Sequence, residues 1–345
     1  FYSNNSSNEL SYYDFDINQI HLQEGGWGKV FSANYKKNNT KVALKFFGYT
    51  KQRPIISEIL KEINLMKSLV GVEGVVQIYG TFNDSSSGYM PNKTIGFHNE
   101  YPVIVMEMLE GGDLFERIST RSTVSEGDLA FSFRSAMEAL QSIHNRGFIH
   151  RDLKLDNLMN ISRNEGTKIK LIDFGFMISI PPTGVVRSNG NLIGTEGWFA
   201  PESITNFEYS KKTDIWQAGC ILYTMLAGHP PFHSNPKYRY QITRLTYSPM
   251  KGAAWDHISD SAKDLVDNML KKNPNERYSM NQVLNHPWLR SAASDVAFND
   301  EYIRRIKNLS LRSKLKRAFL AHNTAEHQNL RDNFQNIFPF LRPFQ

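Results

Sequence analysis

Two polar segments near the middle of the chain combine residue types that could carry out chemistry. Residues 150–157 read His-Arg-Asp-Leu-Lys-Leu-Asp-Asn, and residues 173–175 read Asp-Phe-Gly. Phosphoryl transfer needs an oxygen nucleophile held in line and cations that neutralise phosphate oxygens, so carboxylates, a lysine and an amide are sufficient. In this interpretation Asp152 orients a substrate hydroxyl, and Lys154 screens the migrating phosphoryl group.

The same segments carry oxygen ligands for a metal. Asn157 and Asp173 would hold Mg²⁺, a hard cation that prefers oxygen atoms and few protein contacts. The alternative is an ordinary polar loop between two helices, but four residues of fixed type rarely coincide by chance in one short segment. The residues therefore predict a magnesium-dependent phosphoryl-transfer site.

With Val-Ala-Leu-Lys at 42–45 and Ala-Pro-Glu at 200–202, these segments resemble the motifs of eukaryotic protein kinases, in that family's order. The resemblance implies an α+β fold of two lobes, a small β-rich N-lobe and a larger α-helical C-lobe, with a C-terminal regulatory helix segment. The boundaries that it implies are 1–19 for a flexible lead-in, 20–107 for the N-lobe, 108–289 for the C-lobe and 290–345 for an autoinhibitory tail that binds a calmodulin-like protein.

The resemblance implies ATP as the phosphate donor, with a glycine-rich turn around the phosphates. Gln23 stands where the family usually has its first glycine, but Gly25 and Gly28 remain and let the backbone approach a phosphate closely. The backbone of Glu107 and Leu109 would bind the adenine edge. The full set of implied ATP contacts is Leu22, Gly25, Gly28, Val30, Ala43, Lys45, Glu107, Leu109 and Asp113.

Lys45 lies in a strand-like run, and the resemblance implies that it pairs with the α- and β-phosphates while a helix carboxylate holds it in place. Apolar residues recur at three- and four-residue spacing between 57 and 69, which predicts a helix with one buried face. Glu62 lies beside this face and is the expected partner, and Glu58, one turn earlier, is the alternative. Lys45 and Glu62 complete the predicted catalytic set.

Substrate choice is implied by four residues. Lys154 and Thr195 resemble those of serine/threonine kinases, and Asp113 and Asp156 occupy positions where relatives that prefer basic substrates carry acids. We therefore expect protein substrates with Arg or Lys before the phosphorylated Ser or Thr. Asp113 could equally be the N-cap of a helix over 114–118, which does not exclude the first role.

Other elements must position these residues. Strands are expected over 17–22, 75–82 and 101–106, with a Ser/Gly/Asn-rich surface insertion over 83–100, and an apolar stripe predicts a helix over 129–145. The resemblance implies two structural contacts. Asp214 would bond the catalytic-loop backbone, and Arg277 would pair with Glu202.

The activation segment, 175–200, is often ordered in this family by a phosphate on the segment itself. That phosphate pairs with the arginine of the His-Arg-Asp motif, here Arg151. Relatives carry the phosphorylated threonine three residues before Gly194, where this chain has Asn191. Activation by phosphate at that position is therefore not expected. Ser188 is the alternative acceptor.

Composition fits an ordinary folded protein. The chain has 345 residues, 40% of them hydrophobic, and a single cysteine, Cys220, whose apolar neighbours suggest a core position. No apolar run is long enough to span a membrane and no signal peptide opens the chain, so we expect a cytoplasmic protein. The chain begins at Phe1, so an N-terminal lipid anchor would not be visible.

The net charge of +6 comes from the tail. Seven basic residues lie in it without an intervening acid: Arg304, Arg305, Lys307, Arg312, Lys314, Lys316 and Arg317. The rest of the chain is close to neutral, which argues against a nucleic acid partner. The main alternative to a kinase is a pseudokinase scaffold, which binds nucleotide without efficient phosphoryl transfer.

Residues 302–323 predict a basic amphipathic helix whose apolar face shifts near Ser310. The segment resembles the autoinhibitory junction of calcium-dependent protein kinases of plants and protists, and 329–334 resembles the entering helix of their first EF-hand. No Asp-x-Asp-x-Asp-Gly calcium loop follows. Either the calcium-binding part is cut off or this chain has lost it, so a calcium sensor would act in cis or in trans.

The tail suggests a regulatory role. Lys307 stands at the −3 position to Ser310, so we expect the tail to occupy the acidic substrate cleft near Asp113 and Asp156 until a calmodulin-like sensor extracts it. The alternative is a solvated basic helix without a partner.

Overall fold

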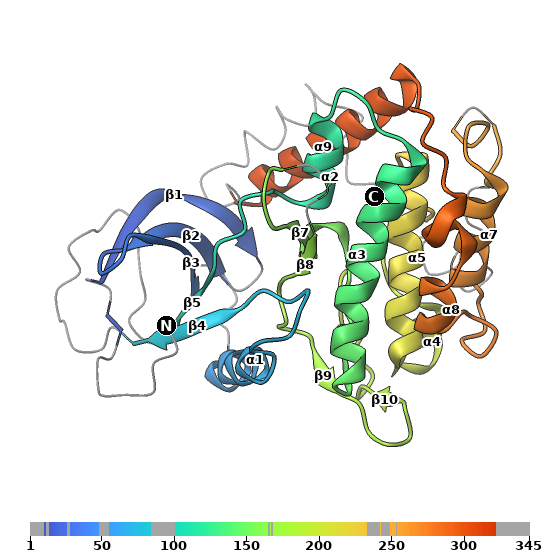
Figure 1. The fold of residues 1–345 in the computed structure, drawn as a ribbon. Helices are drawn as coiled ribbons and strands as arrows, with labels where there is room; N and C mark the ends of the chain where they lie inside the picture. The colour runs from blue at the N-terminus through green and yellow to red at the C-terminus, as the bar shows by residue number, and fades with distance from the viewer. Residues whose placement is uncertain are drawn as a thin grey trace, which may run out of the picture. The chain divides into compact units, whose positions relative to one another are not determined.

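The computed structural model describes residues 10–11, 14–25, 28–47, 55–83, 101–164, 166, 168–232, 242, 249–252 and 254–321. The chain divides into two compact units, the first ending at Glu110 and the second beginning at Gly111. Among the described residues, the N-terminal unit holds a five-stranded sheet and one helix, and the C-terminal unit is mainly helical (Figure 1). The predicted α+β class with a β-rich first part and a helical second part is confirmed.

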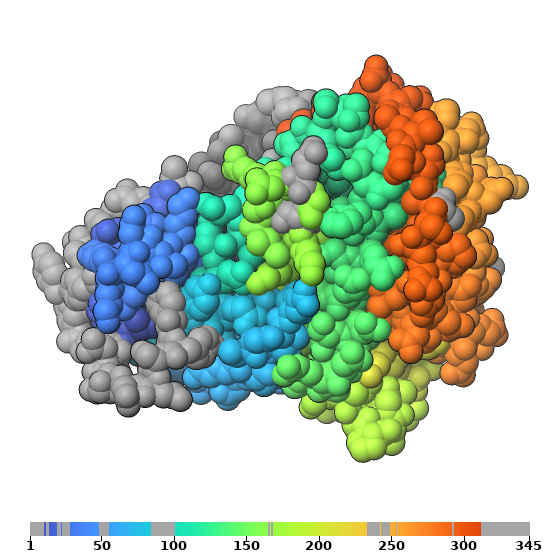
Figure 2. All heavy atoms as spheres, in the orientation of Figure 1, coloured from blue at the N-terminus to red at the C-terminus, as the bar shows by residue number. Residues whose placement is uncertain are grey.

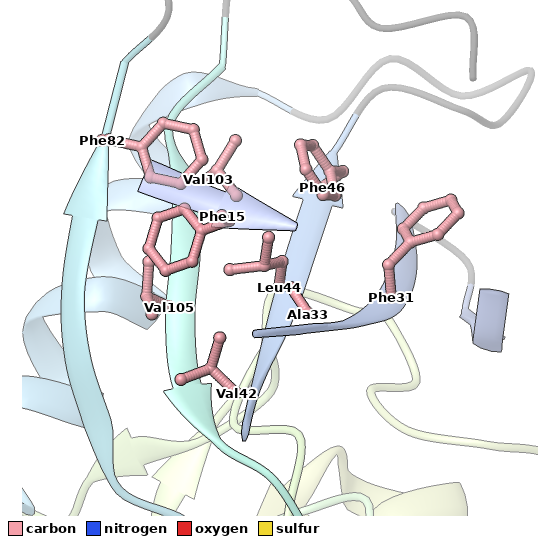
Figure 3. Close-up of a cluster of buried hydrophobic side chains, with 9 residues drawn as sticks. All are labelled: Phe15, Phe31, Ala33, Val42, Leu44, Phe46, Phe82, Val103 and Val105. Atoms are coloured by element: carbon pink, nitrogen blue, oxygen red, sulfur yellow. The ribbon is translucent and has the colours of Figure 1, made fainter. Parts of the chain in front are cut away.

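The N-terminal unit is an antiparallel sheet in the order β1-β2-β3-β5-β4. Its elements are β1 (Phe15–Gly25), β2 (Gly28–Tyr35), β3 (Thr40–Phe47), α1 (Ile56–Ser68), β4 (Ile78–Phe82) and β5 (Val103–Glu107). Successive side chains of a strand point to opposite faces, so the alternating Val42, Leu44 and Phe46 of β3 share one face. They pack there with Phe15, Phe31, Ala33, Phe82, Val103 and Val105 as the core of the unit (Figure 3).

The C-terminal unit is built around helices. They are α2 (Leu114–Thr120), α3 (Glu126–Asn145), α4 (Pro201–Asn206), α5 (Lys211–Ala227), α7 (Asp260–Met269), α8 (Met280–Leu284), a π-helical turn η3 (Trp288–Ala292) and α9 (Asp300–Ala321). Short pairs and a 3₁₀ turn lie between them: β6 (Phe148–Ile149), η2 (Leu155–Asn157), β7 (Leu158–Asn160), β8 (Ile169–Leu171), β9 (Ile178–Ser179), β10 (Val186–Arg187) and β11 (Glu208–Tyr209). The pairs are β6 with β9, β7 with β8, and β10 with β11.

Helix α5 is the centre of this unit. Every residue from Thr213 to Ala227 is buried, so the helix is packed on all sides rather than along one stripe. Cys220 lies in this helix, and burial raises the pKa of its thiol, which confirms it as a core residue. The helix ends at Gly228, whose φ of 76° is the left-handed conformation that glycine adopts readily.

Helix boundaries follow local capping chemistry. The predicted helix over 129–145 begins earlier, at Glu126, because Ser125 and Asp128 form a capping box that satisfies two backbone N–H groups. The helix expected over 57–69 is α1, Ile56–Ser68, with Ile59, Ile63 and Met66 buried as the spacing predicts. Asp113 is the N-cap of α2 and accepts the Glu116 N–H at 2.7 Å.

The start of the tail packs against the C-terminal unit. Gly127 N–H donates to the carbonyl of Ser294, and Phe298 N–H donates to that of Val124, so the segment before α9 lies beside the start of α3. Helix α9 then contacts α2 (Figures 1 and 2). Within the described residues, no helix is both long and apolar enough to cross a membrane.

Several sequence predictions fall outside the described residues. These are most of the lead-in, the insertion at 84–100, the middle of the glycine-rich turn at Gly26 and Trp27, and the segment 329–334. The side chains of Gln23 and of residues 312–321 also lie outside the described set.

Candidate active site

The catalytic loop is held through its backbone by α5. Asp214 accepts the N–H groups of His150 and Arg151, each at 2.9 Å, as the sequence predicts. Gln217, one turn later on the same helix, accepts Leu153 N–H at 3.0 Å and donates to the carbonyl of Arg151 at 2.9 Å. Four main-chain groups are thus fixed by two buried side chains.

The carboxylate of Asp214 is fully buried and stays ionised. Its Oδ2 lies 2.8 Å from Nε2 of His144, at the end of α3. Burial alone would raise the pKa of Asp214, but the hydrogen bond and charge of His144, the charge of His150 and the backbone N–H of His150 outweigh it. The pKa is therefore held below its ordinary value, which favours the charged form.

Asp152 and Lys154 form a compact reactive pair. Nζ of Lys154 lies 2.7 Å from Oδ2 of Asp152 and 2.9 Å from Oγ1 of Thr195. Burial alone would lower the pKa of Lys154, but the neighbouring carboxylates, Asp152 foremost, raise the pKa by more than burial lowers it. The net shift is therefore upward, and the side chain stays a cation. The other oxygen of Asp152, Oδ1, is buried and has no hydrogen-bond partner among the described residues.

An unpartnered buried carboxylate oxygen is costly, so it points to a group that arrives later. The side chain of Asp152 is 2% exposed, and Gly194 lies beside it: a Cβ at Gly194 would come within 3.6 Å of Oδ1. The carbonyl of Arg151 would be only 2.6 Å from the same Cβ. Because Gly194 has no side chain, the space next to Oδ1 of Asp152 stays open, and any other residue at position 194 would fill it.

The two expected metal ligands differ in setting. Asn157 is buried in η2, and its amide nitrogen donates to the carbonyl of Asp152 at 2.9 Å, which ties it to the catalytic residue. Asp173 is exposed, and its φ of 64° is an unusual left-handed backbone for a residue with a side chain. An amide oxygen and one carboxylate suit Mg²⁺, which keeps most of its ligands as water or phosphate.

Other acid and imidazole clusters do not compete for a metal. Within the described residues, no group of three His, Cys, Asp or Glu side chains has the spacing of a metal site. The candidate metal position therefore rests on Asn157 and Asp173.

The N-terminal unit has its own ion pair. Nζ of Lys45 lies 2.5 Å from Oε1 of Glu62, with side chains 16% and 2% exposed. Of the two acids weighed from the sequence, the structure places Glu62 beside Lys45 and leaves Glu58 exposed on the outer side of α1. Because both partners are shielded, solvent screens this pair less than a surface one.

The other residues expected to contact ATP lie on four strands, β1, β2, β3 and β5, and in the segment after β5. Ala43 and Leu109 are buried, Val30 is half-buried and Leu22 is exposed, while the backbone N–H of Glu107 donates a hydrogen bond to the carbonyl of Gln77 at 2.8 Å. Gly25 and Gly28 are paired residues at the turn of the β1–β2 hairpin.

The packing of β2 against β3 requires glycine at position 28. A Cβ there would lie 1.9 Å from the carbonyl oxygen of Phe46, so only glycine fits between β2 and β3. The close approach shown here is between two strands, and the approach to a phosphate stays a prediction.

The two acids expected to bind substrate are partly or fully buried, and one of them already accepts a hydrogen bond within the protein. Asp113 is 7% exposed and caps α2, as the alternative interpretation held, and Asp156 is half-buried in η2. Thr195, the third expected substrate residue, is the hydroxyl that accepts from Lys154.

The activation segment is held by short strand pairs, by hydrogen bonds such as that from Ile193 N–H to the Tyr209 hydroxyl at 2.7 Å, and by an exposed ion pair. Strand β10 pairs with β11, and Arg187 forms two bonds of 3.1 and 2.6 Å to Glu208. The Nε of Arg151 donates to the carbonyl of Phe176 at 2.7 Å, so the arginine expected to receive a phosphate already has an acceptor. Ser188, the alternative phosphate acceptor, donates to the carbonyl of Asn191.

The structural pair Arg277–Glu202 is confirmed. Arg277 donates from both terminal nitrogens to the two carboxylate oxygens of Glu202, at 2.7 and 2.9 Å. The Arg277 side chain is fully buried, and its guanidinium lies 5.1 Å over the ring of Trp216. Such a pair is costly to break from one side.

Sequence reasoning missed His144 and Gln217. A signal existed for Gln217, because it lies three residues after Asp214 and therefore on the same face of α5. His144 follows the apolar stripe of α3 directly, and nothing in its spacing indicates a buried carboxylate from another helix.

Comparison with known proteins agrees with the geometry. A family model described as a protein kinase domain matches residues 18–289. The chain is 31% identical over 326 residues to calcium-dependent protein kinase 15 of Oryza sativa, covering 92% of this chain and 57% of that protein. It is 35% identical over 289 residues to calcium-dependent protein kinase 19 of Arabidopsis thaliana, covering 81% and 49%. The chain thus spans about half the length of these relatives.

Proposed function

Because this chain belongs to the protein kinase family, we propose that it is a serine/threonine protein kinase that transfers the γ-phosphate of ATP to protein hydroxyl groups. The observation that carries the proposal is the buried, unpartnered Oδ1 of Asp152, held beside the Lys154 ammonium. Kinases of this family use ATP and a divalent metal, and the oxygen ligands Asn157 and Asp173 favour Mg²⁺.

Each residue has a task in this mechanism. Oδ1 of Asp152 accepts the hydrogen bond of the substrate hydroxyl, aims its oxygen at the γ-phosphorus and takes its proton. The new O–P bond forms as the bond from the γ-phosphorus to the β–γ bridging oxygen breaks, and ADP leaves. Lys154 donates to the phosphoryl group in transit, and Thr195 orients Lys154. Asn157 and Asp173 would hold Mg²⁺, which when bound would neutralise charge on the phosphate oxygens. Lys45, fixed by Glu62, pairs with the α- and β-phosphates.

The substrate class follows from charge. Asp113 and Asp156 lie in the segments that precede α2 and follow Asp152, and a basic residue before the target hydroxyl would meet them. We propose that substrates carry Arg or Lys before Ser or Thr. Because Asp113 also caps α2, Asp156 is the cleaner residue for testing this preference.

The proposal is tested by following phosphate transfer from labelled ATP to two serine peptides, one with Arg at −3 and one with Ala. Asp152→Asn should lower turnover by about 10²-fold or more, since the general base is lost, with ATP binding nearly unchanged. Asp156→Asn should raise the KM of the arginine peptide alone. ATP binding without transfer by the unmutated chain would instead favour a pseudokinase scaffold.

We propose further that the tail regulates this activity. The relatives named above are called calcium-dependent, and the match to the first of them covers 92% of this chain. Helix α9 is continuous, its first apolar face is buried through Tyr302, Ile303 and Ile306, and Leu311, where the second face begins, is 55% exposed. A calmodulin-like calcium sensor, in cis or in trans, would bind the second apolar face, which begins at Leu311, and displace the helix.

The regulatory role is tested by loosening α9 without truncation, because Tyr302 and Ile306 are part of the core of the C-terminal unit. Ile306→Asp should raise peptide phosphorylation severalfold in the absence of calcium. Asn308→Asp, which adds the same charge at an exposed position of α9, is the matched control. Equal rates in both variants and in the unmutated chain would contradict autoinhibition. Calcium-loaded calmodulin serves as the probe for displacement.

A further inference from the structure

Helix α9 carries a buried hydroxyl where it meets α2. Oγ of Ser310 lies 3.3 Å from Oγ of Ser119, and the two residues are 191 positions apart in the chain. Ser310 is 6% exposed and ends the described face of α9 that also buries Tyr302 and Ile306. Serine is usually found at the surface, so a serine at the end of an apolar face requires an explanation.

The surroundings of this hydroxyl suit a neutral group and not an anion. The proton of Ser119 Oγ is directed to the carbonyl of Glu116 at 2.9 Å, and Thr120 bonds the carbonyl of Arg117 in the same way. These belong to the last turn of α2, where main-chain carbonyls give the helix end a negative partial charge. A dianion at Ser310 would therefore face acceptors.

Two arginines of α2 could in principle compensate, but both have other partners. Arg121 forms an ion pair with Asp128 at 2.7 Å. Arg117 donates to the carbonyl of Asn164 at 2.7 Å, away from the α2–α9 contact. A phosphate on Ser310 would thus lose its water without gaining either arginine as a partner.

The sequence around Ser310 meets the preference proposed above for substrates. Lys307 stands at −3 and is exposed, as is Arg304. A kinase that selects a basic residue before serine would therefore recognise this segment whenever α9 leaves α2.

We propose that Ser310 is a phosphorylation site, and that a phosphate there keeps α9 off α2. In the transfer, Ser310 Oγ bonds to the γ-phosphorus of ATP as the bond to the β–γ bridging oxygen breaks, the hydroxyl proton passes to the catalytic aspartate, and ADP leaves. The phosphate carries about −1.5 to −2 charges, so redocking would place it against the Ser119 hydroxyl, at the end of α2 that has a negative partial charge. The choice of kinase rests on the proposed function; the effect of the phosphate on docking does not.

Docking is tested by hydrogen exchange of the backbone amides of α9 in the full chain. Ser310→Asp should lower protection of residues 302–310 by roughly tenfold or more, because opening becomes easier when a charge must be buried. Ser310→Asn introduces a side chain of the same shape as aspartate but without its charge. This variant should retain most of the protection of the α9 amides. Asn308→Asp places the charge on the exposed side and should retain it all. Equal protection in Ser310→Asp and Ser310→Asn would overturn the proposal.

Modification itself is tested by mass spectrometry after incubation with ATP and Mg²⁺. A separate basophilic kinase is added to the Asp152→Asn chain, so a failure of this chain's own activity is seen separately from a failure of the site. Phosphate should appear on Ser310, faster in Ile306→Asp and severalfold slower when Lys307→Ala is added. Unmodified Ser310 in Ile306→Asp with the added kinase would overturn the site, and phosphorylated Ser310 with undiminished protection would overturn its effect.

Discussion

The catalytic loop and the activation segment lie in the same unit but are held in different ways. The loop is fixed by Asp214 and Gln217, both buried in the central helix, through four bonds to its backbone. The activation segment is held at β10 by an ion pair between Arg187, 75% exposed, and Glu208. Buried bonds to main-chain groups resist water, whereas exposed ion pairs contribute little.

This difference separates a fixed part from an adjustable part. In the proposed mechanism the loop must hold Asp152 to within a fraction of an ångström for in-line transfer, which hydrogen bonds that are costly to break would ensure. The exposed ion pair of the activation segment, by contrast, can be broken at low cost. Gly194 lies at the junction, where the carbonyl of Arg151 would be 2.6 Å from an added Cβ.

The largest effect is expected from breaking the buried support of the loop. Asp214→Asn removes the charge that His144 and two backbone N–H groups compensate, and it turns one acceptor into a donor facing them. We expect the free energy of unfolding to fall by about 3 kcal/mol or more, and turnover to fall with it. Urea unfolding measures the first and peptide phosphorylation the second.

The pH dependence of the same variant sharpens the assignment. The pKa of Asp214 is lowered by folding, so its contribution is present above the unfolded value of about 3.9 and is lost as pH falls through the folded value. The stability difference between the unmutated chain and Asp214→Asn should therefore be larger at about pH 5 than in stronger acid, where the carboxylate becomes protonated. A difference that widened on acidification would show that the carboxylate is not the stabilising form.

An intermediate effect is expected at the junction. Gly194 has φ of 116°, and a Cβ would meet the Arg151 carbonyl at 2.6 Å, so Gly194→Ala must shift backbone on one side or the other. We expect a loss of about 1–3 kcal/mol in stability and a fall in kcat. Gly190→Ala is the control, because Gly190 also has positive φ but nothing lies within 4 Å of its Cβ position. Equal losses in both variants would assign the effect to φ alone.

The smallest effect is expected at the exposed pair. Arg187→Gln should change stability by less than about 1 kcal/mol, and the difference should shrink further at high salt. Its effect on the KM of a peptide substrate should exceed its effect on kcat, because the activation segment positions substrate and leaves Asp152 in place. Loss of kcat as large as in Asp214→Asn would erase the distinction between the two regions.

Much of the fold and part of the site could be predicted from residue spacing. The periodicity of 57–69 and 129–145 locates α1 and α3 to within three residues, because burial of one face leaves a regular pattern. The short pairs β6–β9 and β10–β11 leave no such pattern. Their partners are distant in the chain, so local sequence does not indicate them.

The sequence by itself determined which chemistry is available: Asp152, Lys154, Asn157 and Asp173 are recognisable from type and spacing. Only the tertiary structure decided which atoms are used. It selected Glu62 over Glu58 for Lys45, left Oδ1 of Asp152 without a partner, and brought Ser310 to Ser119. The physical reason is that residue type and periodicity specify which face of an element is buried, whereas the partner on the other side is fixed by packing between segments far apart in the chain.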